Sequence, residues 1–305
     1  MKTDKTIGLI AAPYSPLNPD GSLNPSAVKN YAELLIRNNV QGAFVCGSSG
    51  EGLSLTIAER KILAEEWVKY GGKDLKIMIH VGATSIIDSQ ELANHARSIG
   101  VNGIASIEPI YYMSTWMEDL VTYYKELSSA APGVPFYSYY IPGLTHYQTD
   151  YVEFCKKAIE LIPDFAGVKY TNNNLFEYAQ LIKRFGHELD ILFGSDELLI
   201  NALASGARGA VGSTYNFTPA LYNEIIKHFN NGNIEEAREL QILSQNYISL
   251  MPKYNGSIVF GKAIMNILGI ECGPNRLPLK NLKDKELLQL EKDLKQVGFF
   301  KFVAK

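Results

Sequence analysis

Short apolar segments recur eight times in the first two thirds of the chain, and a helical pattern follows each of them. The segments do not alternate apolar with polar side chains, as half-exposed strands would. Continuous apolar strands separated by helices are typical of βα units that build a parallel sheet. Eight such units predict an α/β fold, the (β/α)8 or TIM barrel, which typically takes ~250 residues. The expected strands span residues 6–12, 42–46, 76–82, 103–109, 134–140, 165–171, 190–195 and 208–213.

Capping residues indicate where several of the intervening helices begin. Thr56 with Glu59 three residues later predicts a capping box, in which the two residues bond each other's backbone amides. Asn24 stands directly before a proline, which suits the first turn of a helix, so we expect Asn24 to be its cap. Ser89 is expected to cap a helix that ends at Gly100.

The pattern changes after residue 231. Three stretches with apolar residues three and four apart follow, without a strand pattern between them, and predict helices within 234–251, 256–269 and 284–298. The connector 272–279 contains two prolines and a glycine, which break a helix. We therefore divide the chain into a catalytic barrel, residues 1–231, and an α-helical C-terminal extension, residues 232–305, that packs on it.

Composition and charge exclude several classes of partner. The 305 residues are 46% hydrophobic and carry 29 Lys and Arg against 32 Asp and Glu, a net charge of −3. This balance gives no general attraction for a polyanion, so we expect no nucleic acid partner. The first apolar run is about a third of the ~18 residues that a membrane span needs, so we expect no membrane association.

Cysteine and histidine spacing bears on location and cofactors. Cys46, Cys155 and Cys272 are odd in number and far apart, which suits reduced thiols in the cytoplasm better than disulfides or a zinc site. The sequence has no G-x-G-x-x-G and no H-E-x-x-H motif. We expect neither a metal nor a cofactor.

Residues at strand exits are the candidates for chemistry, because a barrel of this kind places its active site at the C-terminal ends of its strands. Lys169 ends the apolar stretch FAGVK. It could be an ordinary solvated lysine at a strand end. In an enclosed, dry barrel mouth, however, desolvation would lower the pKa of the amine, which could then attack a ketone to form a Schiff base.

Three other exits carry polar groups. The stretch GSSGE offers backbone N–H groups and the hydroxyls of Ser48 and Ser49, which could hold a carboxylate or phosphate or could simply form a turn. Tyr139 ends an aromatic run, where it could relay protons or only pack. Asp196 and Glu197 follow the seventh strand and could bind hydroxyls, and Asp196 could instead cap the next helix.

The order of these motifs is more specific than any one of them. GSSGE, YxxP, GVK, GxDE and GSTYN stand at successive exits, within strings such as GSSGEGLSLTIAER and GAVGSTYN. From about Ile7 to Leu279, and into GPNRLPL, the chain resembles a class I aldolase family. That family includes the N-acetylneuraminate lyases and dihydrodipicolinate synthase, and the resemblance is closest to the lyases.

The resemblance implies a Schiff-base lyase that cleaves N-acetylneuraminate reversibly to pyruvate and N-acetylmannosamine. Lys169 would form the imine with the C2 ketone, Ser48 and Ser49 would hold the carboxylate, and Tyr139, bonded to Ser48, would move the proton during C3–C4 cleavage. Tyr111 resembles the tyrosine that family members lend across a subunit interface, which implies a homotetramer. The other substrate-binding positions would be Thr171, Gly194, Asp196, Glu197, Gly212 and Ser213.

Other activities remain open on the sequence. Dihydrodipicolinate synthases typically carry an arginine where this chain has Leu144, and an apolar side chain cannot supply the charge-assisted contact. A 2-keto-3-deoxy sugar-acid aldolase would need the same lysine and tyrosine. A non-catalytic sugar-acid binding protein is the alternative from another class. His146 and Asn275 depart from the family's usual glycine and proline; we expect the first near the mouth and the second to be structural.

Overall fold

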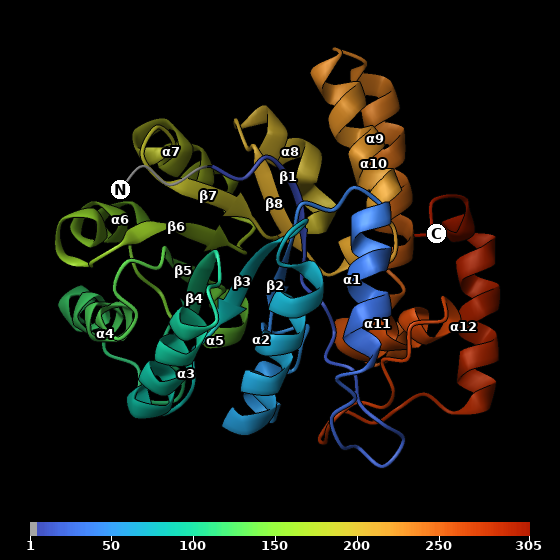
Figure 1. The fold of residues 1–305 in the computed structure, drawn as a ribbon. Coiled ribbons are helices and arrows are strands. Elements are labelled where there is room, and N and C mark those ends of the chain that lie inside the picture. Colours follow the sequence, from blue (N-terminus) through green and yellow to red (C-terminus); the bar gives the residue numbers. More distant parts are fainter. Residues whose placement is uncertain (1–4) are drawn as a thin grey trace.

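Eight parallel strands close into a barrel in the computed structural model, which describes residues 5–305. Each strand pairs with its neighbours in sequence, and β8 closes on β1 (Figure 1). The predicted (β/α)8 barrel is confirmed, and the predicted strands are too long by only one or two residues at an end. The strands are β1 (Gly8–Ala11), β2 (Gly42–Val45), β3 (Lys76–His80), β4 (Gly103–Ile107), β5 (Phe136–Tyr140), β6 (Phe165–Tyr170), β7 (Asp190–Phe193) and β8 (Gly209–Gly212).

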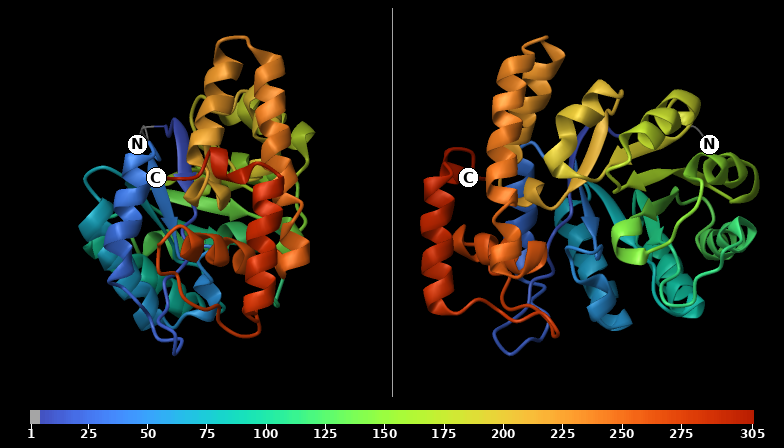
Figure 2. Two further views of the ribbon diagram at one scale, coloured as in Figure 1. Left: turned by 90° about the vertical axis from the view of Figure 1, so that its right-hand side faces the viewer. Right: turned by 180° about the vertical axis from the view of Figure 1, so that it is seen from behind.

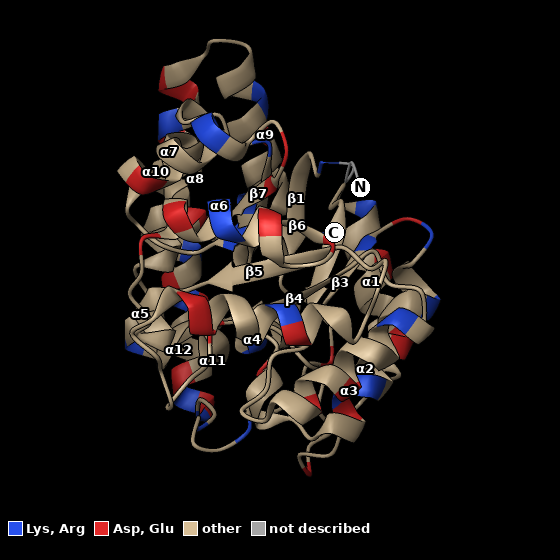
Figure 3. Ribbon diagram, turned by 90° about the vertical axis from the view of Figure 1, so that its left-hand side faces the viewer, with Lys and Arg blue, Asp and Glu red and all other residues tan. Residues whose placement is uncertain are grey.

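Helices surround the barrel, and the outer helices in the view of Figure 3 carry acidic and basic residues interspersed. The barrel helices are α1 (Ala27–Arg37), α2 (Ile57–Gly71), α3 (Ile86–Ser98), α4 (Met117–Ser129), α6 (Tyr151–Leu161), α7 (Leu175–Phe185), α8 (Leu199–Ala204) and α9 (Pro219–Asn230). A short extra helix, α5 (Pro142–Thr145), lies in the connection from β5 to α6. Short 3-10 turns follow three of the strands: η1 (Gly52–Ser54), η2 (Asp196–Leu198) and η3 (Thr214–Asn216).

The strands read as continuous apolar runs because both of their faces are covered. Side chains that point inward, such as Phe44 and Met78, form an inner shell that fills the barrel. Outward side chains such as Phe136 pack against the helices in a larger shell. At the N-terminal end, Asp190 accepts hydrogen bonds from the hydroxyls of Thr6 (2.8 Å) and Tyr137 (3.1 Å). The interior and the N-terminal end of the barrel are therefore filled by side chains, and the polar candidate residues lie at the C-terminal end.

The predicted N-cap is correct for α2 and wrong for α1. The capping box of α2 is confirmed: the Thr56 hydroxyl accepts from the Glu59 amide, and the Glu59 carboxylate accepts from the Thr56 amide. The predicted cap of α1 is wrong, because the helix begins at Ala27 after Ser26. The Asn24 side chain instead accepts a hydrogen bond from the Ser26 hydroxyl at 2.6 Å.

The predicted start of α3 is also wrong. Ser85 is the cap, and its hydroxyl accepts from the Asp88 amide. Ser89 lies inside the first turn, where its buried hydroxyl donates to the Ser85 carbonyl and accepts from the Ala83 amide. Gly100 does follow the end of the helix, with φ of 74°, the left-handed conformation that suits glycine there.

The C-terminal helices are present where the sequence predicts them: α10 (Ile234–Ile248), α11 (Gly256–Ile267) and α12 (Asp284–Gln296), with the turns η4 (Met251–Tyr254) and η5 (Phe299–Lys301). The expected boundary at residue 231 follows the last residue of α9, and α10 returns along α9 (Figures 1 and 2). Gln241 and Gln245 of α10 donate hydrogen bonds to the carbonyls of Asp196 and Glu197. The extension thus contacts the segment that follows β7.

Two further findings concern location and redox state. Within residues 5–305, no helix is both long enough and apolar enough to cross a membrane. Cys46, Cys155 and Cys272 are buried, and none of them is in a disulfide in this part of the chain.

Candidate active site

Lys169, the penultimate residue of β6, lies inside the barrel mouth. Its side chain is 4% exposed, and its Nζ lies 3.9 Å from the centroid of the Tyr139 ring and 4.1 Å from that of Phe44. Burial lowers the pKa of the Lys169 amine from 10.5 to about 7, and the nearby Asp196 carboxylate opposes that shift. At neutral pH a large share of the amine is therefore uncharged and nucleophilic.

Tyr139 and Ser48 meet beside this amine. Tyr139 and Lys169 are register partners on the neighbouring strands β5 and β6. The Tyr139 hydroxyl lies 3.3 Å from the Ser48 hydroxyl. Burial raises the pKa of the Tyr139 phenol to about 12, against the lowering effect of the Ser48 hydrogen bond. The phenol is therefore protonated at neutral pH and can pass a proton along the contact with Ser48.

The GSSGE stretch forms a tight turn at the exit of β2. Cys46 and Glu51 adopt left-handed φ values of 58° and 53°, and the Gly52 amide donates to the Gly47 carbonyl at 3.1 Å. A Cβ on Gly52 would lie 1.8 Å from the Cys46 carbonyl oxygen, so only glycine fits there. Ser48 and its neighbour Ser49 remain half-buried at the mouth.

Asp196 lies against β8 at the same end of the barrel. Its Oδ2 accepts hydrogen bonds from the Thr214 amide (2.9 Å) and hydroxyl (2.6 Å), so it caps the turn after β8 rather than the helix that follows it. A Cβ on Gly212 would lie 1.9 Å from Asp196 Oδ1, which explains the glycine. Burial raises the pKa of the Asp196 carboxyl to about 7. Glu197 and Ser213 are half-buried at the same two exits.

Gly194 and Thr171 make a similar close contact at the exits of β7 and β6. A Cβ on Gly194 would lie 2.0 Å from Thr171 Oγ1. That buried hydroxyl has no hydrogen-bond partner of acceptable geometry among residues 5–305. A polar ligand atom in the barrel mouth could satisfy it.

Among the described residues, Tyr111 makes no hydrogen bond or ring contact with the other predicted site residues. It lies on the connection after β4 with φ of 73°, and its side chain is 84% exposed and packs edge-on against Tyr112, with ring centroids 4.9 Å apart. Of the two departures from the family pattern, Asn275 has a local explanation and His146 has none. His146 has φ of 58°, the conformation that favours the family's glycine, and Asn275 donates two hydrogen bonds to Asn281.

Phe44 and Glu108 are not among the residues predicted from the sequence. Phe44 contacts the lysine amine with its ring, but an aromatic residue in an apolar strand gives no signal beyond core packing. Glu108 is buried directly after β4, and burial raises its pKa to about 8. A carboxyl group directly after an apolar strand is a sequence feature that could have identified Glu108 as a candidate.

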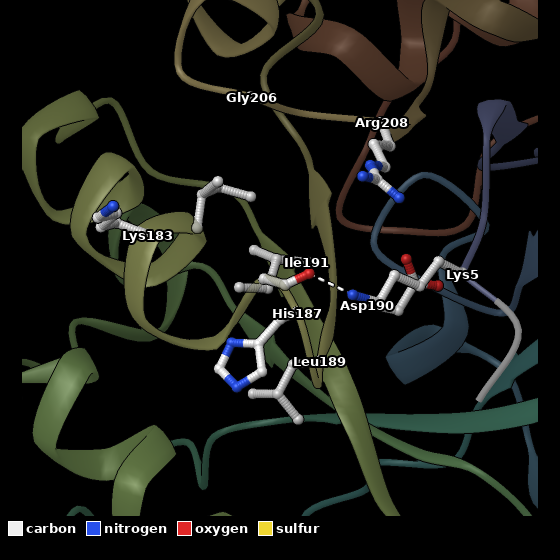
Figure 4. A pocket seen from close by; sticks show the side chains of 10 residues that line it. Lys5, Lys183, His187, Leu189, Asp190, Ile191, Gly206 and Arg208 are labelled. Carbon is white, nitrogen blue, oxygen red and sulfur yellow. Dashed lines mark hydrogen bonds between the residues drawn. The ribbon is translucent and has the colours of Figure 1, made fainter. Parts of the chain in front are cut away.

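Two cavities lie at opposite ends of the barrel. One, of about 370 Å³, lies at the N-terminal ends of β7 and β8 and contains none of the predicted site residues (Figure 4). The other, of about 230 Å³, opens beside Ser48. Its lining comprises Cys46, Gly47, Ser48, Glu51, Gly52, Leu53, Ser54, His80, Ile107, Leu144, Ile258 and Leu279.

Comparisons with known proteins agree with this geometry. N-acetylneuraminate lyase from Gallus gallus is 41% identical over 297 residues, 96% of each chain, and that from Homo sapiens is 38% identical over 303 residues, 98% of this chain and 94% of the human one. Among solved structures, Proteus mirabilis N-acetylneuraminate lyase has a TM-score of 0.94 at 34% identity, covering 97% of this chain and all of that one. A catalytic lysine mutant of Ruminococcus gnavus sialic acid aldolase has a TM-score of 0.91 at 30% identity, covering 97% of each. The sequence model of the dihydrodipicolinate synthetase family matches residues 5–297, and the chain belongs to that family.

Proposed function

We propose that this protein is a Schiff-base aldolase that cleaves the sialic acid N-acetylneuraminate reversibly to pyruvate and N-acetylmannosamine. The observation that carries the proposal is the buried Lys169 amine, with its lowered pKa, packed on Tyr139 beside Ser48. Relatives at about 40% identity over nearly the whole chain are N-acetylneuraminate lyases, and one related aldolase is known to have a catalytic lysine.

The chemistry follows from an uncharged amine in an enclosed site. The Lys169 nitrogen attacks C2 of the open-chain keto acid, and loss of one water molecule with uptake of one proton gives a protonated imine. The final hydrolysis releases that proton again. When the C4 hydroxyl loses its proton, the C3–C4 electron pair moves toward the imine, releasing the aldehyde and leaving an enamine. The proton returns to C3, and one water molecule then hydrolyses the imine to pyruvate and free lysine. The water lost in imine formation is thus replaced.

Tyr139 is the proton relay in this scheme. Its phenol keeps its own proton at neutral pH, so it accepts the proton from the C4 hydroxyl while its own moves to Ser48. The Ser48 hydroxyl proton moves in turn to the substrate carboxylate that Ser48 is proposed to hold, and the reverse transfers deliver a proton to C3. Ser48 and Ser49 are proposed to hold the carboxylate through hydroxyl and backbone N–H groups of the β2 turn.

The hydroxyl-bearing chain of the substrate is assigned to the exits of β6, β7 and β8. Asp196 Oδ2 is occupied by Thr214, so its Oδ1 is the atom proposed to accept from a substrate hydroxyl. The Thr171 hydroxyl, which lacks a partner of acceptable geometry in the described chain, is a second contact. Gly194, Glu197, Gly212 and Ser213 complete the proposed set.

We further propose a cytoplasmic homotetramer in which Tyr111 of one subunit enters the site of its neighbour. Two observations support the proposed contribution of Tyr111 to a neighbouring site. Tyr111 projects from the barrel end with most of its surface exposed, and a largely apolar cavity opens beside Ser48. Leu144, 64% exposed at the cavity, offers no charge for a second carboxylate, which disfavours the dihydrodipicolinate synthase reaction.

Trapping of the imine tests the proposal. The protein is incubated with pyruvate, reduced with borohydride and digested, and the adduct is located by peptide mass. We expect modification at Lys169 and none in Lys169→Ala. A label at another residue, or no label, contradicts the aldolase assignment.

Substrate choice is a separate measurement. We expect kcat/KM for N-acetylneuraminate to exceed that for 2-keto-3-deoxygluconate. The opposite preference would replace the proposed substrate by a 2-keto-3-deoxy sugar acid without changing the imine chemistry.

A further inference from the structure

The turn after β2 that is proposed to bind the carboxylate ends at Glu51, whose side chain contacts the C-terminal extension. Glu51 follows the two serines of the GSSGE stretch, and its amide donates to the Ser48 carbonyl at 3.1 Å. Its backbone is held at φ of 53°, a conformation that costs a non-glycine residue energy unless its surroundings fix it. The carboxylate is buried within the protein, so its contacts determine where the turn sits.

Both carboxylate oxygens of Glu51 are bound by the C-terminal extension. Lys262 of α11 donates from Nζ to Oε1 at 2.8 Å, and the Arg276 amide donates to Oε2 at 2.8 Å. Lys262 also donates to the Pro274 carbonyl at 2.6 Å. The side chains of Lys262 and Glu51 are only 1% and 2% exposed. The ion pair between Lys262 and Glu51 is thus buried, and it joins two residues that are 211 positions apart in the sequence.

We infer that Lys262 is a positioning residue for the site: through Glu51 it holds the β2 turn so that Ser48 and Ser49 face the substrate carboxylate. The inference rests on the proposed function. Lys262 itself touches none of the proposed reacting groups, so its effect is expected on binding of the keto acid and not on the reactivity of Lys169.

Because an unpaired charge is costly to bury, the Glu51–Lys262 pair is expected to fix the position of the turn after β2. A buried carboxylate that loses its ion-pair partner is expected to recruit water, take up a proton or move. Any of these changes weakens the hold of α11 on Glu51, and we expect the Ser48 hydroxyl to lose its fixed position as a result. Removing both charges together leaves neither one unpaired, so a doubly neutral variant is expected to fold.

The test measures pyruvate binding by the rate of borohydride inactivation. The rate constant is determined as a function of pyruvate concentration, which gives a half-saturating concentration and a limiting rate constant. Lys262→Met keeps the length of the side chain and removes its charge. Lys253→Met is the matched control, because Lys253 lies in the same extension and pairs with Asp293 at the surface.

We expect Lys262→Met to raise the half-saturating pyruvate concentration about tenfold or more, with the limiting rate constant within about threefold of wild type. Lys253→Met should leave both unchanged. A general loss of structure would lower only the fraction of protein that reacts. An unchanged half-saturation in Lys262→Met, or an equal rise in Lys253→Met, overturns the inference.

The double variant Glu51→Gln/Lys262→Met covers the case in which the single variant does not fold. Its amide oxygen can still accept from the Arg276 amide, but the tether to α11 is absent, so we expect a rise of about threefold or more. No rise in the double variant also overturns the inference. Failure of wild-type protein to form an adduct at Lys169 is a different result, and it contradicts the proposed function.

Discussion

Lys169 changes its protonation near neutral pH, and this sets the pH dependence of the proposed chemistry. Its pKa of about 7 means that the amine is mostly protonated, and unreactive, below pH 7. We expect the rate of borohydride trapping with pyruvate, at one fixed concentration below saturation, to rise about tenfold per pH unit below 7 and to level off above it. A rate that keeps rising toward pH 10 would indicate a solvated lysine and contradict the burial argument.

At the residue scale, the candidate residues predicted from the sequence lie at the ends of apolar strands, whereas Phe44, inside a strand, and Glu108, directly after β4, were not predicted. Lys169 and Tyr139 can be recognised in the sequence because each places a polar group at the end of an otherwise apolar strand. Phe44 could not be identified, since its ring serves the inner shell and the amine at once. In the proposed tetramer Tyr111 would contact a neighbouring subunit, and the single chain shows only that its side chain is exposed.

At the element scale, the capping box of α2 is the clearest local determinant. Thr56→Ala removes the hydroxyl that accepts from the Glu59 amide, and we expect the free energy of unfolding to fall by about 1 kcal/mol. Thr122→Ala is the control, because that exposed hydroxyl in α4 donates only to the carbonyl four residues earlier. Urea unfolding of both variants measures the loss in free energy of unfolding, and equal losses would contradict a stabilising role of the Thr56 cap.

Strand positions were predictable because burial on both faces leaves a continuous apolar signal. Helix starts were less so. Ser85 and Ser89 are both good caps by residue type, and the choice follows from the bond between the Ser89 hydroxyl and the Ala83 amide, a contact made only when the loop after β3 folds back.

At the scale of the whole molecule, Tyr111→Ala tests the proposed assembly. We expect a smaller species in sedimentation and a fall in kcat of about tenfold or more, since the neighbouring site would lose its contributed hydroxyl. Phe176→Ala is the control, because Phe176 is also a highly exposed aromatic residue, at the start of α7. Full activity with unchanged sedimentation would remove Tyr111 from the site.

The way the extension docks could not be predicted from the sequence. Helical periodicity placed α10, α11 and α12 correctly, but it carries no information on which partner each helix meets. The pairing of Lys262 with Glu51 depends on the path of the connector around residue 274, which brings α11 over the β2 turn.

The inner apolar shell has a consequence for the order of events in the proposed reaction. Because the barrel is filled below Lys169, substrate and both products share one entrance. The three-carbon fragment stays covalently attached at the bottom until water reaches the imine, while the aldehyde is free as soon as the carbon bond breaks. The sugar fragment must therefore depart first and pyruvate second, and the reverse synthesis must load them in the opposite order.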